Sequence, residues 1–340
     1  MIDPLLEKIF LFWEDNHYAD PDLQSLKLRT KIFIEEARKQ NAEIQVLKNK
    51  NRQTNNFRLT IQNKTIHFTS LPLAEHKNGK IFHQIDDKLK CKKILSNKKF
   101  PTPEGRGFWF FQKKRALKYG LKLGFPLVVK PRFGSVSRHV TTNITNKKEL
   151  FLAIKYTLEY APTFIIEKYL QSGFVHRVTI IDQEKIFCAK QIPAHVIGDG
   201  ASTIEELITL KNLDPKRDGS FYYPLIPNSN INLNKILPDQ EIKFIQTDPF
   251  MKLGGDIEEV TNKIHKKNLY FFNKIAKELN IKIIGLDFIC DDITEPFYKQ
   301  PCGILEINTL PCIEMHHLPS IGPKQNPAKY IFELTKKYYL

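Results

Sequence analysis

The hydrophobic pattern of the chain is that of short strands alternating with amphipathic helices. Near the C-terminal end, residues 283–289 and 303–308 form two apolar runs of strand length, separated by a stretch rich in turn-forming residues. The first run holds a single carboxylate, Asp287, at its centre. We expect the two runs to pair antiparallel, because the connection between them lets the chain turn back on itself.

The second apolar run ends in Glu306-Ile307-Asn308. Side chains alternate between the faces of a strand, so Glu306 and Asn308 should share one face, about 7 Å apart. Leu305 and Ile307 should then face a core, and antiparallel pairing would bring Asp287 beside the two polar residues. Carboxylate and amide oxygens at this spacing can bind Mg²⁺ that is held by phosphates. The same spacing is equally typical of solvated polar faces on two ordinary strands.

The same periodicities predict the remaining elements. We expect helices over residues 26–40, 87–96, 147–160, 261–279 and 327–339, and a further helix near the N-terminus. We expect strands at 57–62 and 64–69, paired as a hairpin, and at 125–130, 163–167 and 178–191, the last divided by a turn at 182–183. Residues 211–250 are rich in Pro, Asn and Asp, which predicts an insertion or a mobile loop.

Composition narrows the class of protein. The 340 residues are 41% hydrophobic, enough for two or three lobes that each have a core. No apolar run reaches the roughly 18–20 residues that span a bilayer, and the first residues carry acids rather than a signal pattern. The five cysteines lack CxxC spacing, which argues against a disulfide framework or a zinc site. We therefore expect a cytoplasmic protein without membrane contact.

The net charge of +15 raises the question of a nucleic-acid partner. The lysines are spread along the whole chain, and no helix-turn-helix, zinc finger or aromatic RNA-binding motif accompanies them. A diffuse lysine excess is more typical of a solvated surface or of a pocket for anionic ligands. We therefore do not expect nucleic acid as the partner.

Residues 127–139 run from a buried strand through Lys130 into a loop of small residues. A lysine at a strand end can contact phosphate oxygens, and Gly134, Ser135 and Ser137 offer backbone N–H groups and hydroxyls as further donors. Sequences of this kind are common, so Lys130 can equally be a residue that merely ends an edge strand.

A series of short motifs runs in order from about residue 85 to the end of the chain. They are Asp87-Lys88 with Pro101–Gly105, FPLVVKP at 125–131, IIEKYL at 165–170, AKQIPAHVIGDGASTIEEL at 189–207, Asp214–Arg217, Gly254-Gly255, GLDFI at 285–289, LEIN at 305–308 through Pro311, Met315-His316 and Pro319-Ser320. In this order and spacing the chain resembles the ATP-grasp superfamily. The likeness is closest to the ATP-grasp modules of cyanophycin synthetase and of the bifunctional glutathione synthetases.

The resemblance implies an α+β fold in which two lobes clasp ATP between them. The small lobe would span residues 86–165 and the large lobe residues 166–340, with the insertion near 211–250. Residues 1–85 would form a small N-terminal α/β domain of unknown role.

The resemblance also implies a role for individual residues. Lys88 and Lys130 would contact the α- and β-phosphates, beside the loop with Ser135 and Ser137. Glu167 and the following Lys168, Tyr169 and Leu170 would form the hinge that reads adenine, largely through backbone groups. Asp287, Glu306 and Asn308 would hold two Mg²⁺ ions, for which Mn²⁺ can substitute. Arg177 and Lys190 would stabilise the transferred phosphoryl group.

The implied reaction joins a carboxylate to an amine. ATP would activate the carboxylate as an acyl phosphate, and the amine would displace phosphate to form an amide. The substrate would be an amino acid or a small peptide, and the basic net charge favours an acidic one. Enzymes of the two likened types carry an additional catalytic domain, which we do not expect in this chain. We therefore expect a stand-alone ligase, a homodimer, or a partner of a separately encoded enzyme.

The chain departs from the family pattern at several positions. Ser137 and His139 stand where the phosphate loop is expected to have glycines, and Val175 stands where an acid would hold the ribose. Lys252-Leu-Gly-Gly255 replaces Ser-Thr-Gly-Gly, and Glu314 replaces an arginine. Ser137, His139 and Val175 leave open an alternative, a non-catalytic ATP-binding module that regulates or scaffolds. The changes at 252–255 and at Glu314 favour a different substrate. His195, which follows Pro-Ala, is more typical of a structural histidine than of a catalytic one.

Overall fold

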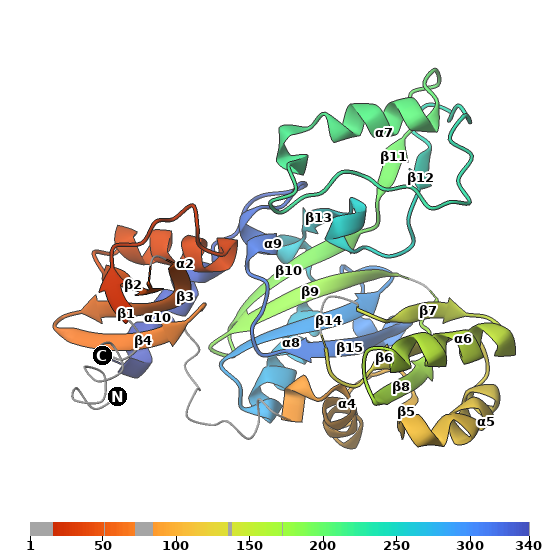
Figure 1. Ribbon diagram of the computed structural model, residues 1–340, viewed down its shortest axis with the longest axis horizontal. Coiled ribbons are helices and arrows are strands. Elements are labelled where there is room, and N and C mark those ends of the chain that lie inside the picture. The colour runs from red at the N-terminus through yellow and green to blue at the C-terminus, as the bar shows by residue number, and fades with distance from the viewer. Residues whose placement is uncertain (1–15, 51, 72–83, 135–137, 172, 340) are drawn as a thin grey trace.

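The computed structural model describes residues 16–50, 52–71, 84–134, 138–171 and 173–339. Its helices include α2 (Leu28–Lys39), α4 (Lys88–Asn97), α5 (Lys113–Leu123), α6 (Lys147–Leu158), α7 (Ile204–Asn212), α8 (Lys266–Leu279), α9 (Glu314–His317) and α10 (Pro327–Tyr339). The expected N-terminal helix falls mainly on residues outside these ranges. Figure 1 shows a central sheet flanked by three smaller units.

The central sheet has five strands in the order β13-β10-β9-β14-β15, all antiparallel to their neighbours. Their bounds are β9 (Phe174–Ile181), β10 (Lys185–Ile192), β13 (Asp256–Glu259), β14 (Ile283–Cys290) and β15 (Cys302–Asn308). Helix α8 covers one face, because its apolar stripe, which includes Phe272 and Ile275, packs on Phe288 and its neighbours. The other face borders the cleft described below.

The predicted helix over 261–279 is too long at its start. Residues Thr261–Lys263 form a separate 3-10 turn, and α8 begins at Lys266. His265 is the N-cap residue of α8, and its side chain accepts a hydrogen bond from the backbone N–H of Lys267 at 3.1 Å. A side chain that accepts from the first turn is a stronger start signal than apolar spacing.

The second unit is a four-stranded sheet in the order β5-β8-β6-β7, covered by α5 and α6 (Figure 1). Its strands are β5 (Gly105–Trp109), β6 (Leu127–Pro131), β7 (Thr141–Ile144) and β8 (Thr163–Lys168). Helix α4 lies before this sheet in sequence but packs on the core of the central sheet through Cys91 and Leu95. The start of α4 therefore lies where the two sheets approach each other.

The N-terminal unit is a sheet in the order β1-β2-β3-β4 with α2 packed on it. Its strands are β1 (Asn16–Ala19), β2 (Glu43–Asn49), β3 (Arg52–Ile61) and β4 (Lys64–Thr69). The predicted hairpin across Asn63 is confirmed by the pairing of β3 with β4. The C-terminal helix α10 lies beside this sheet (Figure 1). It completes the core of the unit, because Phe332 packs against Phe33.

Residues 193–255 form a third unit, here called the cap, which contains α7, β11 (His195–Ile197) and β12 (Ile242–Phe244). Val196, Leu207 and Leu237 belong to its own apolar core. Helix α7 begins in a capping box, since Thr203 and Glu206 exchange side-chain and backbone hydrogen bonds. The stretch 211–250, predicted as an insertion or a mobile loop, thus supplies part of a packed core.

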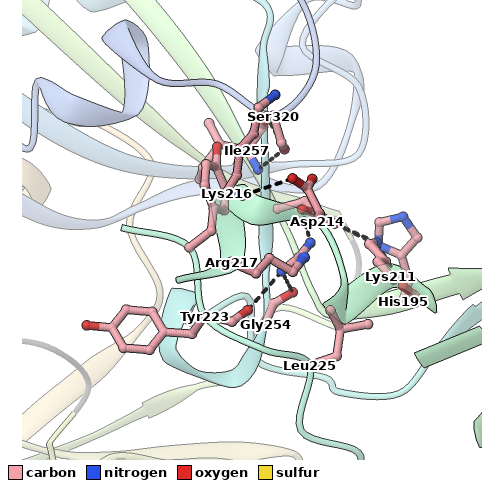
Figure 2. Close-up of polar contacts among 12 residues, drawn as sticks. His195, Lys211, Asp214, Lys216, Arg217, Tyr223, Leu225, Gly254, Ile257 and Ser320 are labelled. Atoms are coloured by element: carbon pink, nitrogen blue, oxygen red, sulfur yellow. Dashed lines mark hydrogen bonds and ion pairs between the residues drawn. The ribbon is translucent and has the colours of Figure 1, made fainter. Parts of the chain in front are cut away.

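A buried ion-pair cluster fastens the cap to the central sheet. Arg217 donates to the carbonyl oxygens of Tyr223 and Gly254, as Figure 2 shows, and also pairs with the Asp256 carboxylate at the start of β13. The Lys211 ammonium lies 2.7 Å from the same carboxylate. Asp256 therefore joins two cations of the cap to the edge of the central sheet.

Candidate functional site

A cleft of about 620 Å³ opens between the two sheets and is bordered on one side by the cap. Its charged lining includes Lys88, Lys130, Glu167, Asp248, Asp287 and Glu306. Most of the residues expected to bind nucleotide and metal therefore border one cavity, although they come from separate parts of the chain.

Arg177, Asp287 and Glu306 form a row across the central sheet. Asp287 pairs in register with Arg177 on β9 and with Glu306 on β15, and residues directly opposite each other share a face. The Arg177 guanidinium grips the Asp287 carboxylate through two hydrogen bonds, of 2.6 and 3.2 Å. The expected antiparallel pairing and the meeting of Asp287 with Glu306 are confirmed.

The register slips once in this strand pair, because Asp287 faces Glu306 while Phe288 faces Ile304. The residue skipped is Leu305, which lines the cleft. The expectation that Leu305 faces a core is therefore wrong, since strict alternation does not continue through a bulge. Leu305 also presents its carbonyl oxygen to the Lys130 ammonium, 3.4 Å away.

Lys88 lies at the first turn of α4, which begins after the N-cap residue Asp87. Its ammonium lies 3.4 Å from Oε1 of Glu306 and donates to the Gly134 carbonyl oxygen in the expected phosphate loop. Burial raises the pKa of Glu306, and the nearby Asp287 carboxylate adds to the increase while Lys88 opposes it. The site thus crowds two carboxylates on one face of the sheet.

Asp287, Glu306 and Asn308 offer the hard oxygen donors that Mg²⁺ prefers. Asn308 is two residues beyond Glu306 on β15 and pairs in register with Gly285. No group of three or more His, Cys, Asp or Glu suited to a metal occurs among the described residues. The Asn308 amide would add a third oxygen-bearing residue to these two carboxylates, each of which is paired with a cation in the protein alone.

Glu167 lies at the centre of a buried triad. Its carboxylate is 2.5 Å from the Lys130 ammonium and 2.9 Å from that of Lys92. Burial raises the pKa of Glu167, but the two lysines more than offset it and hold the pKa below its usual value. Glu167 therefore anchors Lys130 in place.

The hinge residues after Glu167 fasten the small sheet. The Lys168 ammonium donates to the carbonyl oxygens of Gly124 and Phe125, both at 3.0 Å, and the Tyr169 backbone N–H donates to Pro126. The backbone N–H of Leu170 has no acceptor within the described part of the chain. Leu170 lines the cleft and is the donor that the hinge leaves available.

The structure does not bring Lys190 together with Arg177. Lys190 pairs in register with His176, one position out of phase with Arg177, so it lies on the opposite face of the sheet. Its ammonium is 3.8 Å from Glu258 and 3.9 Å from the centre of the Phe174 ring. The next residue, Gln191, lines the cleft instead.

Several other expected features have other surroundings. Ser135 and Ser137 lie outside the described residues. The His139 ring stacks on Tyr156 of α6 and on Tyr160 just beyond that helix, and it does not line the cleft. Glu314 forms an ion pair with Arg29 of the N-terminal unit, at 3.3 Å. His195 packs against Phe244, which fits the structural role expected for it.

Sequence reasoning missed Lys92, Gln191 and Asp248. Lys92 belongs to a lysine-rich helix, and its residue type alone does not distinguish it from its neighbours. It lies four residues after Lys88 and so on the same helical face, which is a signal that could have identified it. Asp248 stands in a stretch without periodicity, and only the folded cap brings it to the cleft.

No family model matches the chain. Cyanophycin synthetase from Synechocystis sp. is 30% identical over 262 residues, covering 73% of this chain and 30% of the relative. The glutathione biosynthesis bifunctional protein GshAB from Clostridium perfringens is 25% identical over 327 residues, covering 92% of this chain and 41% of the relative. The chain therefore spans less than half the length of these curated relatives.

A solved structure of a bifunctional glutathione synthetase from Pasteurella multocida superposes with a TM-score of 0.67. The identity is 18%, and the match covers 93% of this chain and 44% of that one. The fold and the relatives expected from the motif order are confirmed. In the described part of the chain no helix is long and apolar enough to cross a membrane.

Proposed function

We propose that this chain, which has the ATP-grasp fold and is related to carboxylate–amine ligases of that superfamily, is itself an ATP- and Mg²⁺-dependent ligase of this kind. The observation that carries the proposal is the row formed by Arg177, Asp287 and Glu306 at the cleft, opposite Lys88 and Lys130. Two carboxylates facing two lysines suit a metal-bound polyphosphate. The cleft thus holds carboxylate oxygens that can bind a cation and ammonium groups that can bind phosphate oxygens.

The phosphate contacts would come from Lys88 and Lys130. Lys130 is held by Glu167, so its ammonium is positioned before ATP arrives and loses little freedom on binding. In the protein alone the Lys88 ammonium contacts Glu306. When a metal ion neutralises that carboxylate, the ammonium would contact phosphate oxygens instead. The free backbone N–H of Leu170 would donate to adenine.

Asp287, Glu306 and Asn308 would hold Mg²⁺, which when bound supplies positive charge against the polyphosphate. Two ions, and replacement by Mn²⁺, remain part of the proposal. Arg177 lies against Asp287 and would orient this carboxylate while adding a further fixed positive charge near the transferred group. Lys190 has no part in this proposal, because it lies on the other face of the sheet.

The reaction would proceed in two displacements. A carboxylate oxygen of the first substrate attacks the γ-phosphorus of ATP, giving an acyl phosphate and ADP. The amine nitrogen then attacks the acyl carbon, the C–O bond to phosphate breaks, and the nitrogen loses a proton to give the amide. Fixed cations and exclusion of water would favour both steps, since charge develops on oxygen in each.

The test is ADP release from purified protein with ATP and Mg²⁺, against pools of amino acids and short peptides. Mass spectrometry of the same reactions would seek a product lighter by one water than its two parts. ADP together with such a product supports the ligase. ATP binding without ADP release in any pool would instead favour a non-catalytic ATP-binding module.

A further inference from the structure

Three consecutive aromatic residues are exposed between β5 and α5. Trp109, Phe110 and Phe111 have exposed fractions of 47%, 54% and 69%. The rings of Trp109 and Phe111 stack with their centres 6.2 Å apart, and the Phe110 ring meets Phe111 edge-on. Single exposed rings are common on protein surfaces, whereas rings that pack on one another form a patch. We call residues 109–111 the aromatic tip.

The backbone of the aromatic tip is held by hydrogen bonds. The Phe110 backbone N–H donates to the carbonyl oxygen of Pro162 at 2.8 Å, and that of Trp109 donates to Oε1 of Gln112 at 2.9 Å. Trp109 also pairs in register with Thr163, the first residue of β8. The tip is therefore fixed beside the segment that follows α6.

The exposed faces of α5 and α6 adjoin the aromatic tip. Gly120 of α5 lies so close to α6 that a Cβ there would be 2.6 Å from Cδ2 of Leu150, and both helices cover the small sheet at the end of the molecule away from the N-terminal unit (Figure 1). Because their apolar sides pack on the sheet, their other sides face outward. The exposed cations on the two helices are Lys113, Lys114, Arg115, Lys118, Lys122, Lys147, Lys148 and Lys155.

These eight cations have no carboxylate within ion-pair distance among the described residues. The two helices contain one acid, Glu149, which accepts hydrogen bonds from Thr145 and Asn146 at the start of α6. Exposed lysines elsewhere do have partners, as in the pair of Lys98 with Glu278. The positive charge of this surface is therefore left for an anionic partner.

Apolar side chains lie among the cations. Leu121 of α5 is 45% exposed, and Phe151 and Leu152 of α6 are 47% and 53% exposed. Lysines attract the anionic headgroups of a bilayer, and apolar side chains beside them can enter the layer just beneath. Aromatic rings, tryptophan above all, favour that boundary. Charge and apolar area on this surface thus suit a lipid bilayer.

The same residues suit a nucleic acid less well. Bases stack on open ring faces, whereas Trp109 and Phe111 stack on each other and the exposed leucines offer no ring. Seven of the eight cations are lysines, which lack the planar fork with which arginine binds phosphate through two hydrogen bonds.

We propose that the aromatic tip and the outward faces of α5 and α6 bind bilayers that contain anionic phospholipid. The exposed rings and leucines would enter the headgroup layer while the cations lie against lipid phosphates. No described residue of α5 or α6 lines the cleft, so this contact would not occupy the cleft itself. The surface would act independently of the proposed ligase activity. Sequence analysis predicted no membrane contact because no segment is long enough to span a bilayer, and binding at the surface needs no such segment.

The test is cosedimentation of the full chain with vesicles of phosphatidylcholine alone or with about 30% phosphatidylglycerol. We expect binding to the anionic vesicles, and we expect it to weaken as added salt screens the charges. Lys118→Gln with Lys122→Gln should weaken this binding about 10- to 30-fold, since each lysine near an anionic surface contributes roughly fivefold. Lys274→Gln with Lys277→Gln is the matched control, because it removes two exposed lysines from α8.

Phe111→Ala tests entry of the rings and should weaken binding about tenfold. Its control is Tyr270→Ala, which removes a ring that is 72% exposed on α8. Tryptophan fluorescence of the native protein should shift to the blue on anionic vesicles, and Trp109→Phe should abolish that shift. Thermal unfolding should give the native Tm for each variant, because every substituted side chain is exposed.

Absence of binding to the anionic vesicles at low salt would overturn the proposal. Equal weakening by the α5 and α8 lysine variants would also overturn it, because net charge rather than this surface would then be responsible. So would full binding by Phe111→Ala without a fluorescence shift in the native protein, which would indicate adsorption by charge alone. Binding of a single-stranded RNA oligonucleotide in place of vesicles, weakened by the α5 variant, would assign the surface to nucleic acid instead.

Discussion

Asp287 and Glu306 lie directly opposite each other on neighbouring strands, and each is paired with a cation of its own, Arg177 or Lys88. Directly opposed like charges destabilise a sheet unless something neutralises them. The two cations do so in the protein alone, and a metal would do so in the nucleotide complex. The arrangement therefore explains how two carboxylates can be kept opposite each other at this strand pair.

The first prediction concerns the metal ligands. Glu306→Gln should lower ADP formation about 10²- to 10³-fold, by analogy with loss of a fixed electrostatic contact to a transition state. The steady-state rate at saturating ATP would be measured across a Mg²⁺ series. Asp291→Asn serves as the control, since Asp291 is exposed just beyond β14. A Mg²⁺ dependence unchanged by Glu306→Gln would exclude Glu306 as a ligand.

A second prediction follows from the raised pKa of Glu306, whose ordinary value is 4.5. The folded protein binds this proton more tightly than the unfolded chain, so this group favours folding as the pH falls through its raised pKa. Metal requires the ionised form. The increase in Tm given by Mg²⁺ with ADP should therefore shrink as the pH falls through the same range.

Thermal unfolding with and without Mg²⁺ and ADP, measured from neutral to acidic pH, checks this dependence. Glutamine does not titrate. In Glu306→Gln the increase in Tm caused by Mg²⁺ and ADP should therefore depend less on pH than it does in the native protein. A native protein whose shift is constant across the range would contradict the assignment.

The elements around the site could be predicted from the sequence because each depends on local periodicity. The β14–β15 pair, with Asp287 beside Glu306, follows from two apolar runs and a turn. Leu305 shows where periodicity stops predicting the site, because a one-residue bulge brings its side chain to the cleft. The role of Lys190 was implied by the resemblance alone, and its register with His176 places it on the other face of the sheet. Such single steps are decided by neighbouring strands rather than by the segment itself.

Lys92 and Asp248 escaped prediction for a different reason. Lys92 has the same local sequence as the solvated lysines around it, and only its contact with Glu167 on β8 distinguishes it. Asp248 reaches the cleft through the packing of the cap. Long-range contacts of this kind leave little trace in a single sequence.

The third prediction tests the Lys92–Glu167 contact. Lys92→Ala should destabilise the protein by about 3–5 kcal/mol, because removal of one partner leaves a buried carboxylate with a single cation. Urea unfolding measures this loss. Lys92→Met removes the same charge but keeps most of the side-chain volume, so it should cost nearly as much as Lys92→Ala if the lost ion pair is the cause. A loss for Lys92→Met that is much smaller than the loss for Lys92→Ala would show that packing, rather than charge, dominates.

The last prediction concerns the attachment of the cap. Asp256→Asn removes the charge that Arg217 and Lys211 share, and leaves a buried guanidinium without its carboxylate. Because these contacts join the cap to the edge of the central sheet, the effect should be local opening of the cap rather than global unfolding. Hydrogen exchange should therefore accelerate in α7, while α8 keeps its protection.

The same variant should leave Lys88 and Lys130 in place, because these lysines do not belong to the cap. Glu241→Gln is the control. It breaks the Lys235–Glu241 pair on the same cap, which is 3.8 Å long and exposed on both sides, and such pairs contribute less than about 1 kcal/mol. If Asp256→Asn accelerates exchange equally in α7 and α8, the cluster stabilises the whole fold and does not act as a local attachment.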